Sequence, residues 1–138
     1  MTYEVPIERG KVREFARATK SKNPAFQGPS AVIPPTFLTT ARMTWEPREE
    51  DQIGKLGLDL RRLLHAEEEY IFHGEPPRAG QTLTCETRLL DQWEKEGRRG
   101  GTMKFSRIVN EFRDATGQLV AEQRTTLVVT ARPPKEAS

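Results

Sequence analysis

The sequence predicts a single α+β domain with an antiparallel β-sheet, and two patterns support this prediction. Residues 36–45 are apolar at nearly every position, as in a helix that is covered on all sides. From about residue 63 onward, apolar and polar side chains alternate with the period of a β-strand. Turn-forming segments at 94–101 and 114–117 join the last three strands, which is typical of an antiparallel meander.

The composition limits the classes of function that need to be considered. The 138 residues fit one domain over 1–138, with a core from about 3 to 131 and a polar tail at 132–138. The 22 basic and 20 acidic side chains are interspersed and leave a net charge of +2, so no basic stripe points to nucleic acid. The hydrophobic fraction of 35% is low for a monomer and favours an oligomer.

The cysteine content and the absence of apolar runs indicate where the protein works. Cys85 is the only cysteine, which excludes an internal disulfide and a multi-cysteine metal site and fits a reducing compartment. The first residues do not have the basic and apolar regions of a secretory signal, and no stretch reaches the length of a membrane span. We therefore expect a cytoplasmic protein.

Two helices are expected before the strands. Residues 8–20 place Val12, Phe15 and Ala16 on one face of an amphipathic helix. Residues 36–45 predict a second helix with Arg42 as its only charge, and Pro35 suits its first position because the missing N–H costs nothing there. Since this second helix has no charged face, we expect it to be buried in the centre of the domain.

The strand around residue 68 has two faces of different character. Glu68 falls in register with Leu64, Tyr70 and Phe72, so its carboxylate is expected on the apolar face. There it could be an acid or base with a shifted pKa, or it could lie at a strand edge or pair with an arginine. The other face holds polar residues, namely His65, Glu67, Glu69 and His73. The two histidines are too far apart along a strand for one metal ion, so no metal site is expected.

The later strands carry the remaining core. Cys85 lies on the inner face of the strand at 83–89 and is expected to be a small core residue and not a nucleophile. The apolar residues of 103–112 change parity, which predicts a β-bulge near residues 106–107. The inner face of the last strand is predicted to consist of Leu119, Ala121, Thr125, Leu127 and Val129.

Three segments in this order resemble the MaoC-like dehydratase N-terminal domain, also called the FAS1-like dehydratase domain. They are AVIPPTFL at 31–38, LHAEEEY at 64–70 and PRAGQTL at 77–83. The resemblance covers about residues 3–131. It implies a hot-dog fold, in which an antiparallel sheet wraps around a buried central helix, and a role in the reversible dehydration of 3-hydroxyacyl thioesters. It implies no cofactor in the chain, because the substrate itself carries coenzyme A or the phosphopantetheine of acyl carrier protein.

Active members of that family carry an Asp-x-Asn-Pro-x-His segment, and this chain departs from it. The matching residues keep Asn23 and Pro24, but Ser21 stands at the Asp position and Phe26 at the His position. A phenyl ring cannot carry a proton, and an unassisted serine is a weak acid and base. No catalytic residue is therefore expected in this chain. The resemblance implies that a separate hydratase subunit with the intact motif supplies them.

The resemblance also implies where an acyl thioester would bind. Free N–H groups of Thr36 and Phe37, at the start of the central helix after Pro35, could hold the thioester oxygen. In the alternative interpretation, Pro34 and Pro35 only stiffen the loop. The expected substrate-binding residues are Asn23, Pro24, Phe26, Pro35, Thr36 and Phe37.

Three functions remain open from the sequence. The leading one is a non-catalytic, acyl-binding subunit of a heteromeric (3R)-hydroxyacyl-thioester dehydratase, or enoyl-CoA hydratase, acting on acyl-CoA or acyl carrier protein in fatty-acid or related metabolism. The second is a self-contained hot-dog thioesterase or hydratase that uses a carboxylate such as Glu68. The third is a homodimeric acyl-binding module without turnover.

Overall fold

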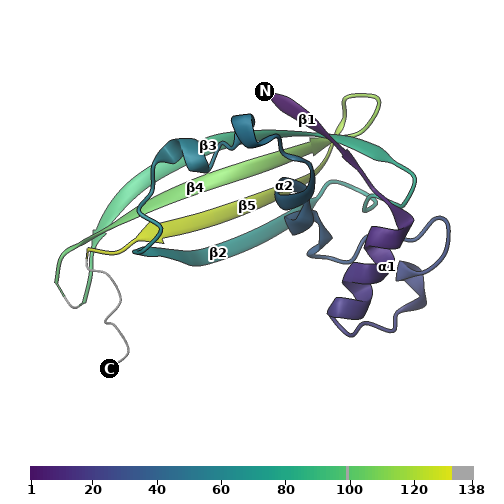
Figure 1. Cartoon of the computed structure of the whole chain (residues 1–138), viewed down its shortest axis with the longest axis horizontal. Coiled ribbons are helices and arrows are strands. Elements are labelled where there is room, and N and C mark those ends of the chain that lie inside the picture. Colours follow the sequence, from purple (N-terminus) through teal and green to yellow (C-terminus); the bar gives the residue numbers. More distant parts are fainter. Residues whose placement is uncertain (99, 132–138) are drawn as a thin grey trace.

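Five antiparallel strands form the sheet in a computed structural model that describes residues 1–98 and 100–131. The sheet order is β1-β3-β4-β5-β2, so the meander β3-β4-β5 is flanked by β1 on one side and β2 on the other (Figure 1). Each neighbouring pair is antiparallel. The strand bounds are β1 Thr2–Pro6, β2 Leu63–Phe72, β3 Thr82–Glu96, β4 Thr102–Arg113 and β5 Leu119–Val129.

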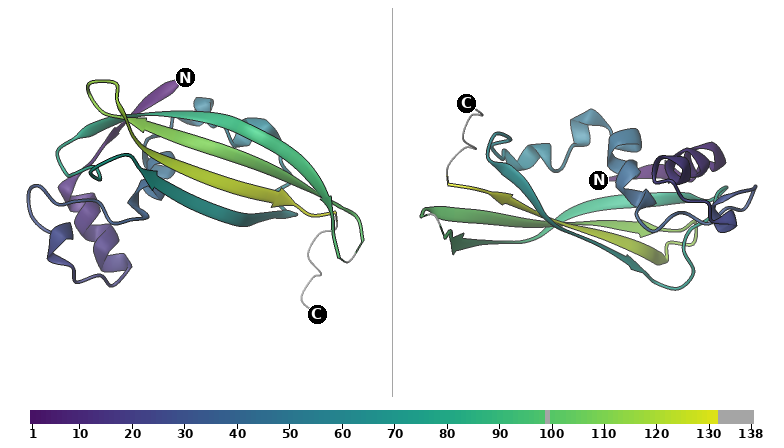
Figure 2. Two further views of the ribbon diagram at one scale, coloured as in Figure 1. Left: turned by 180° about the vertical axis from the view of Figure 1, so that it is seen from behind. Right: turned by 90° about the horizontal axis from the view of Figure 1, so that it is seen from below.

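The helices lie on one side of the sheet (Figure 2). They are α1 at Arg9–Ala18 and α2 at Thr40–Trp45, with short 3₁₀ segments at Pro24–Phe26, Phe37–Thr39, Arg48–Glu50 and Gly54–Leu56. We call the side of the sheet on which they pack the covered face and the other side the open face. The expected α+β, hot-dog type of architecture is thus confirmed, with the sheet curving around the segment that holds α2.

The centre of the core is a row of side chains across three strands of the covered face. Phe112 of β4 lies between Cys85 of β3 and Ala121 of β5, and all three are fully buried. Because both neighbours of the large ring are small, the ring can contact the segment above the sheet. Phe37, Leu38 and Ala41 from that segment complete the cluster. Replacing a buried phenylalanine by alanine typically costs about 3–5 kcal/mol of folding free energy.

The central helix differs from its prediction. It begins two residues later than expected, as the 3₁₀ turn Phe37–Thr39, and continues as an α-helix of only six residues. Pro35 therefore precedes the helix and does not occupy its first position. One side of the helix is also open, because Met43 is 85% exposed although the sequence around it is apolar. The opposite side of this short helix packs on the core row, so the helix is covered on one side only.

The predicted bulge lies on the neighbouring strand. β4 pairs without interruption through residues 106–107, and the shift occurs in β3 between Leu89 and Asp91, opposite Ile108 and Arg107. The predicted bulge at 106–107 is therefore absent from β4, and the parity change arises because Phe105 faces the opposite side of the sheet from Ile108 and Phe112. A second irregularity, which the sequence pattern did not reveal, lies in β2 between His65 and Glu67. Bulges of this kind turn a side chain to the other face of the sheet.

The N-terminal end of the chain also differs from the expectation. The strand β1 was not predicted, although Tyr3 and Val5 alternate with polar residues and pair with Cys85 and Leu83 of β3. The predicted polar tail at 132–138 lies outside the described residues. The predicted amphipathic helix is confirmed as α1, with Val12 and Ala16 fully buried.

The open face carries ion pairs within and between strands and one aromatic stack. Glu111 pairs with Arg88 and Arg113, and Glu122 pairs with Arg124 and His73. At the far end of the β3-β4 hairpin, the rings of Trp93 and Phe105 stack with their centroids 5.1 Å apart, and the Arg107 guanidinium lies over Trp93. The ionic character of this face fits contact with water.

We predict that the chain forms dimers or larger assemblies by joining sheets through the edge of β2. This edge strand has ten residues, twice the length of β1, and an unpaired strand edge of that length favours further strand pairing. Amide hydrogen exchange should show protection of alternate β2 amides that face away from β5. A stable monomer at micromolar concentration in sedimentation, with rapid exchange at those amides, would contradict the prediction.

Candidate functional site

The loop that carries the motif positions is fixed by the end of α1. The Ser21 N–H donates to the Ala16 carbonyl over 2.8 Å, and the Lys20 N–H donates to the Arg17 carbonyl over 3.0 Å. Lys20 takes the left-handed conformation with φ of 58° that this type of helix ending requires. The hydroxyl of Ser21 then accepts a hydrogen bond from the Asn23 N–H at 3.3 Å. The polar group at the Asp position is thus used inside the loop.

Asn23 and Pro24 preserve the turn, as the sequence predicted. The Asn23 side-chain oxygen accepts from the Ala25 N–H at 3.0 Å and caps the 3₁₀ turn Pro24–Phe26, which Pro24 begins. This turn directs the ring of Phe26 toward the hydrophobic core, against which it packs while half-buried. The residue at the His position is therefore a packing residue.

The expected oxygen-binding backbone at the start of the central helix is partly engaged. The Phe37 N–H donates to the Pro34 carbonyl at 3.0 Å, so it is not free for a ligand. The ring of Phe37 is buried and meets Phe15 of α1 edge-on, with centroids 5.6 Å apart. Thr36 and Pro35 are exposed beside it. Phe26 and Phe37 thus both pack in the hydrophobic core, Phe37 as a buried member and Phe26 at its edge.

A second cluster of polar groups lies under the other end of the helix. Glu46 has a side chain that is only 4% exposed, and burial raises its pKa although Arg42 lies 3.3 Å away. Burial also raises the pKa of Tyr3 and raises that of Cys85 to about 12. Cys85 is therefore a protonated core thiol at neutral pH, in agreement with the sequence interpretation.

Beyond the apolar row, the covered face carries a hydrogen-bonded network that crosses four strands. Thr87 donates to Asn110 at 2.7 Å, and Asn110 donates to Gln123 at 3.0 Å. Gln123 donates to Glu68 and, at 3.4 Å, to the hydroxyl of Tyr70. Glu68 also accepts from Thr125 at 2.9 Å and contacts His65 at 2.8 Å.

This network identifies the partners of Glu68. Glu68 lies on the covered face with Tyr70 and Phe72, as predicted, and its partners are Thr125, Gln123 and His65. No arginine is among the partners that the described residues give it. The sequence reasoning missed Asn110 and Gln123, although both stand at inward parity, Asn110 between the apolar residues Ile108 and Phe112.

His65 does not lie where the alternation placed it. The bulge leaves Ala66 without a partner on β5, so His65 pairs with Leu127 and turns to the covered face beside Glu68. Leu64, which was expected beside Glu68, moves to the open face for the same reason. His73 keeps the predicted polar face and pairs with Glu122 at 2.7 Å. Among the described residues, no group of three or more side chains could hold a metal ion.

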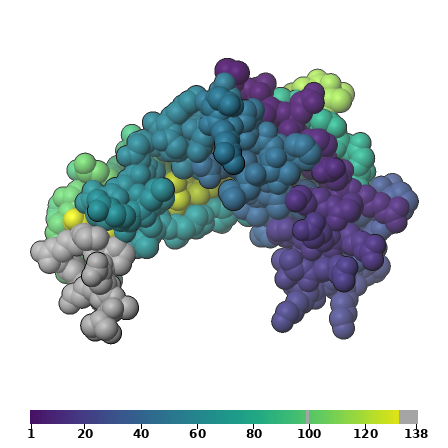
Figure 3. Space-filling view, in the orientation of Figure 1, coloured from purple at the N-terminus to yellow at the C-terminus, as the bar shows by residue number. Residues whose placement is uncertain are grey.

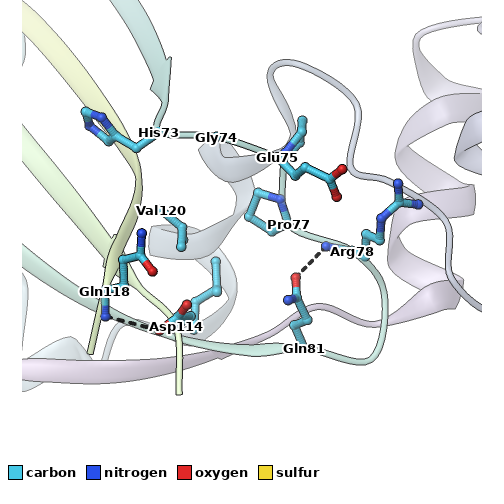
Figure 4. A pocket seen from close by; sticks show the side chains of 11 residues that line it. His73, Gly74, Glu75, Pro77, Arg78, Gln81, Asp114, Gln118 and Val120 are labelled. Atoms are coloured by element: carbon cyan, nitrogen blue, oxygen red, sulfur yellow. Dashed lines mark hydrogen bonds between the residues drawn. The ribbon is translucent and has the colours of Figure 1, made fainter. Parts of the chain in front are cut away.

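A polar pocket of about 310 Å³ lies at one end of the sheet, and its lining includes His73 but neither Glu68 nor His65. The loop after β2 and the turn between β4 and β5 form its walls, with Arg78, Gln81 and Asp114 among the lining residues (Figure 4). Gln81 accepts a hydrogen bond from the Arg78 N–H at 2.7 Å, which fixes the loop. None of the sequence-predicted binding residues lines this pocket.

Comparison with known proteins assigns the fold to a family. The sequence profile described as the FAS1-like dehydratase domain region matches residues 2–123. The chain belongs to this family. A UPF0336 protein of Saccharopolyspora erythraea is 31% identical over 141 residues, which span 94% of this chain and 85% of the relative. A UPF0336 protein of Streptomyces coelicolor is 32% identical over 142 residues, 95% of this chain and 87% of the relative.

Solved structures share the fold of this FAS1-like dehydratase domain. A chain of the HadBC (3R-hydroxyacyl-ACP dehydratase) complex of Mycobacterium tuberculosis aligns with a TM-score of 0.72 and 24% identity, over 93% of this chain and 94% of that one. A chain of the ChsH1-ChsH2 complex of the same organism aligns with a TM-score of 0.77 and 14% identity, over 100% and 87%. At these identities the likeness establishes the hot-dog fold. No helix among the described residues is long and apolar enough to cross a membrane.

We predict that Cys85 resists thiol reagents in the folded protein. The side chain is fully buried and its pKa lies near 12, so the reactive thiolate is scarce below pH 9. Labelling with a maleimide or a disulfide reagent at pH 8 should be slow, and it should become complete once denaturant unfolds the chain. Rapid labelling of the native protein would contradict the buried position of Cys85.

Proposed function

We propose that this chain is the non-catalytic, acyl-binding subunit of a heteromeric (3R)-hydroxyacyl-thioester dehydratase. One observation carries the proposal. The motif loop keeps its turn through Asn23 and Pro24, but Ser21 is hydrogen-bonded within the loop and Phe26 packs on the core. Dehydration needs one group to remove the proton beside the thioester carbonyl and another to serve the hydroxyl. Neither motif position can supply such a group.

The family and the architecture support a partner that supplies both groups. Two structures with this fold are complexes of different subunits, HadBC and ChsH1-ChsH2. The long free edge of β2 gives this chain a surface for joining a second sheet. We propose a hydratase subunit with Asp-x-Asn-Pro-x-His as that partner, and acyl-CoA or acyl carrier protein as the ligand. The ligand brings its own phosphopantetheine, so the proposal needs no resident cofactor. A cytoplasmic location stays a prediction from the sequence.

We expect the purified chain to show negligible hydration of trans-2-enoyl-CoA. Positioned acid–base groups contribute about 10²–10⁴-fold to rate, and both are missing at the motif. The direct measurement is loss of the enoyl absorbance with the chain alone and then with whatever protein co-purifies from the native cell. Activity that appears only in the mixture supports the proposal. Turnover by the chain alone at ordinary enzyme rates would disprove it.

A double substitution tests whether only the two motif groups are missing. Ser21→Asp with Phe26→His restores both proton-handling groups on a loop that the Asn23 cap still holds. We expect measurable hydration from the double variant and none from either single variant, because each group depends on the other.

Packing sets the control for this experiment. Replacing Phe26 removes an aromatic ring from the core edge and costs stability, so each variant must first be shown to fold by circular dichroism. Phe26→Leu serves as the matched control, since it changes packing without adding a proton carrier. A folded double variant that binds acyl-CoA but has no turnover would show that the chain lacks more than these two groups.

A further inference from the structure

The bulge in β2 has a specific consequence for His65. Regular alternation would place His65 and Glu68 on opposite faces, because their positions in the strand differ by three. The unpaired Ala66 reverses the parity, and both side chains then meet on the covered face at 2.8 Å. A bulge interrupts strand pairing and is common where a side chain must be re-aimed. Here the re-aimed side chain is an imidazole.

Glu68 does not need this imidazole to satisfy its own carboxylate. One oxygen accepts from Gln123, and the other accepts from Thr125 at 2.9 Å. Gln123 is in turn held by Asn110, so its amide orientation is fixed by the network. The Glu68 carboxylate, which Gln123 and Thr125 hold in place, therefore positions the His65 ring.

The position of the acceptor fixes the tautomer of the ring. A carboxylate oxygen only accepts, so the neutral imidazole places its proton on Nε2, which faces Glu68, and leaves a lone pair on Nδ1. No described residue donates to Nδ1. The His65 side chain is 54% exposed, whereas that of Glu68 is 22% exposed. The hydrogen-bonded network thus ends at the Nδ1 atom of His65, which is an acceptor on an exposed side chain.

Part of β5 is uncovered on the face that carries the helices (Figure 3). In the space-filling view, yellow atoms of β5 remain visible between the blue atoms of the segment after α2 and the teal atoms of β2 (Figure 3). Thr125 of β5, which bonds Glu68, is only partly buried. A ligand on the covered face could therefore reach this part of the sheet.

We propose that His65 is a specificity-determining residue that binds a hydroxyl group of the acyl ligand, with Glu68 as its positioning residue. This assignment rests on the proposed acyl-binding function. An Nδ1 lone pair accepts a hydrogen bond, so it selects a group that donates one. A hydroxyl donates, whereas a ketone oxygen or a methylene does not. The chain then distinguishes hydroxylated acyl thioesters from saturated ones of the same length.

Binding measurements on the full chain, or on the heteromer if it is isolated as one, test the proposal. The probes are saturated acyl-CoA and matched acyl-CoA carrying a hydroxyl at successive carbons. We expect one hydroxylated isomer to bind about tenfold more tightly than the saturated ligand, as one hydrogen bond contributes. His65→Ala should abolish this preference and leave the affinity for the saturated ligand unchanged.

His73 provides a matched control. It also contacts a glutamate, Glu122, at 2.7 Å, but on the open face. His73→Ala should keep the tenfold preference. For Glu68, the nitrogen chemical shifts of the His65 ring give a second readout. They should report a proton on Nε2 in the native chain and a mixture of tautomers in Glu68→Gln, with a weakened hydroxyl preference.

The outcomes separate this proposal from the function on which it rests. Equal binding of all isomers by the native chain, or a preference that survives His65→Ala, overturns the role of His65 and leaves acyl binding intact. Absence of binding to every acyl-CoA overturns both. Loss of preference in His73→Ala as well would show that the effect is not specific to the covered face, and it also overturns the assignment.

Discussion

The structure depends on one constraint, which is that a large ring in the middle strand lies between two small neighbours. Phe112 needs the space that Cys85 and Ala121 leave, and all three are excluded from water. The ring rises from the sheet far enough to meet Phe37 and neighbouring residues of the segment that leads into α2. Because that contact holds the segment against the sheet, the positions of the preceding motif loop and the following acidic loop depend on it.

The same covered face changes from apolar to polar two residues along β4. Asn110 is the next residue on this face before Phe112, and it belongs to the network that runs from Thr87 to Glu68 and His65. Buried amides are costly unless each group is paired, and here donors and acceptors alternate across the strands without a gap. The covered face is therefore apolar beside Phe112 and hydrogen-bonding toward β2.

The periodic patterns predicted much of this fold, and their failures have a common physical origin. The alternation of apolar and polar residues correctly placed Cys85, Ala121 and Glu68 on the inner face, because in a regular strand the side-chain period alone determines which face a residue occupies. It failed at His65, where one extra residue in β2 reverses the facing of the side chains, and at residues 106–107, where the predicted bulge is absent and the shift lies in β3. Whether a strand accepts an extra residue depends on its partner strand, and single-strand patterns do not contain that information. The short central helix is a related case, since its open side is decided by tertiary packing.

The motif loop shows why retained residues and retained chemistry must be considered separately. Asn23 caps the turn, Pro24 begins it, and the Ser21 N–H closes the end of α1, so all three have folding roles that need no substrate. Such roles keep a loop in its shape even after its proton carriers are gone. Phe26 goes further, since it contributes a ring to the core that a histidine would fill less well. The loop therefore combines the backbone of a catalytic segment with the side chains of a structural one, and this combination fits a subunit that holds the acyl group while another subunit performs the chemistry.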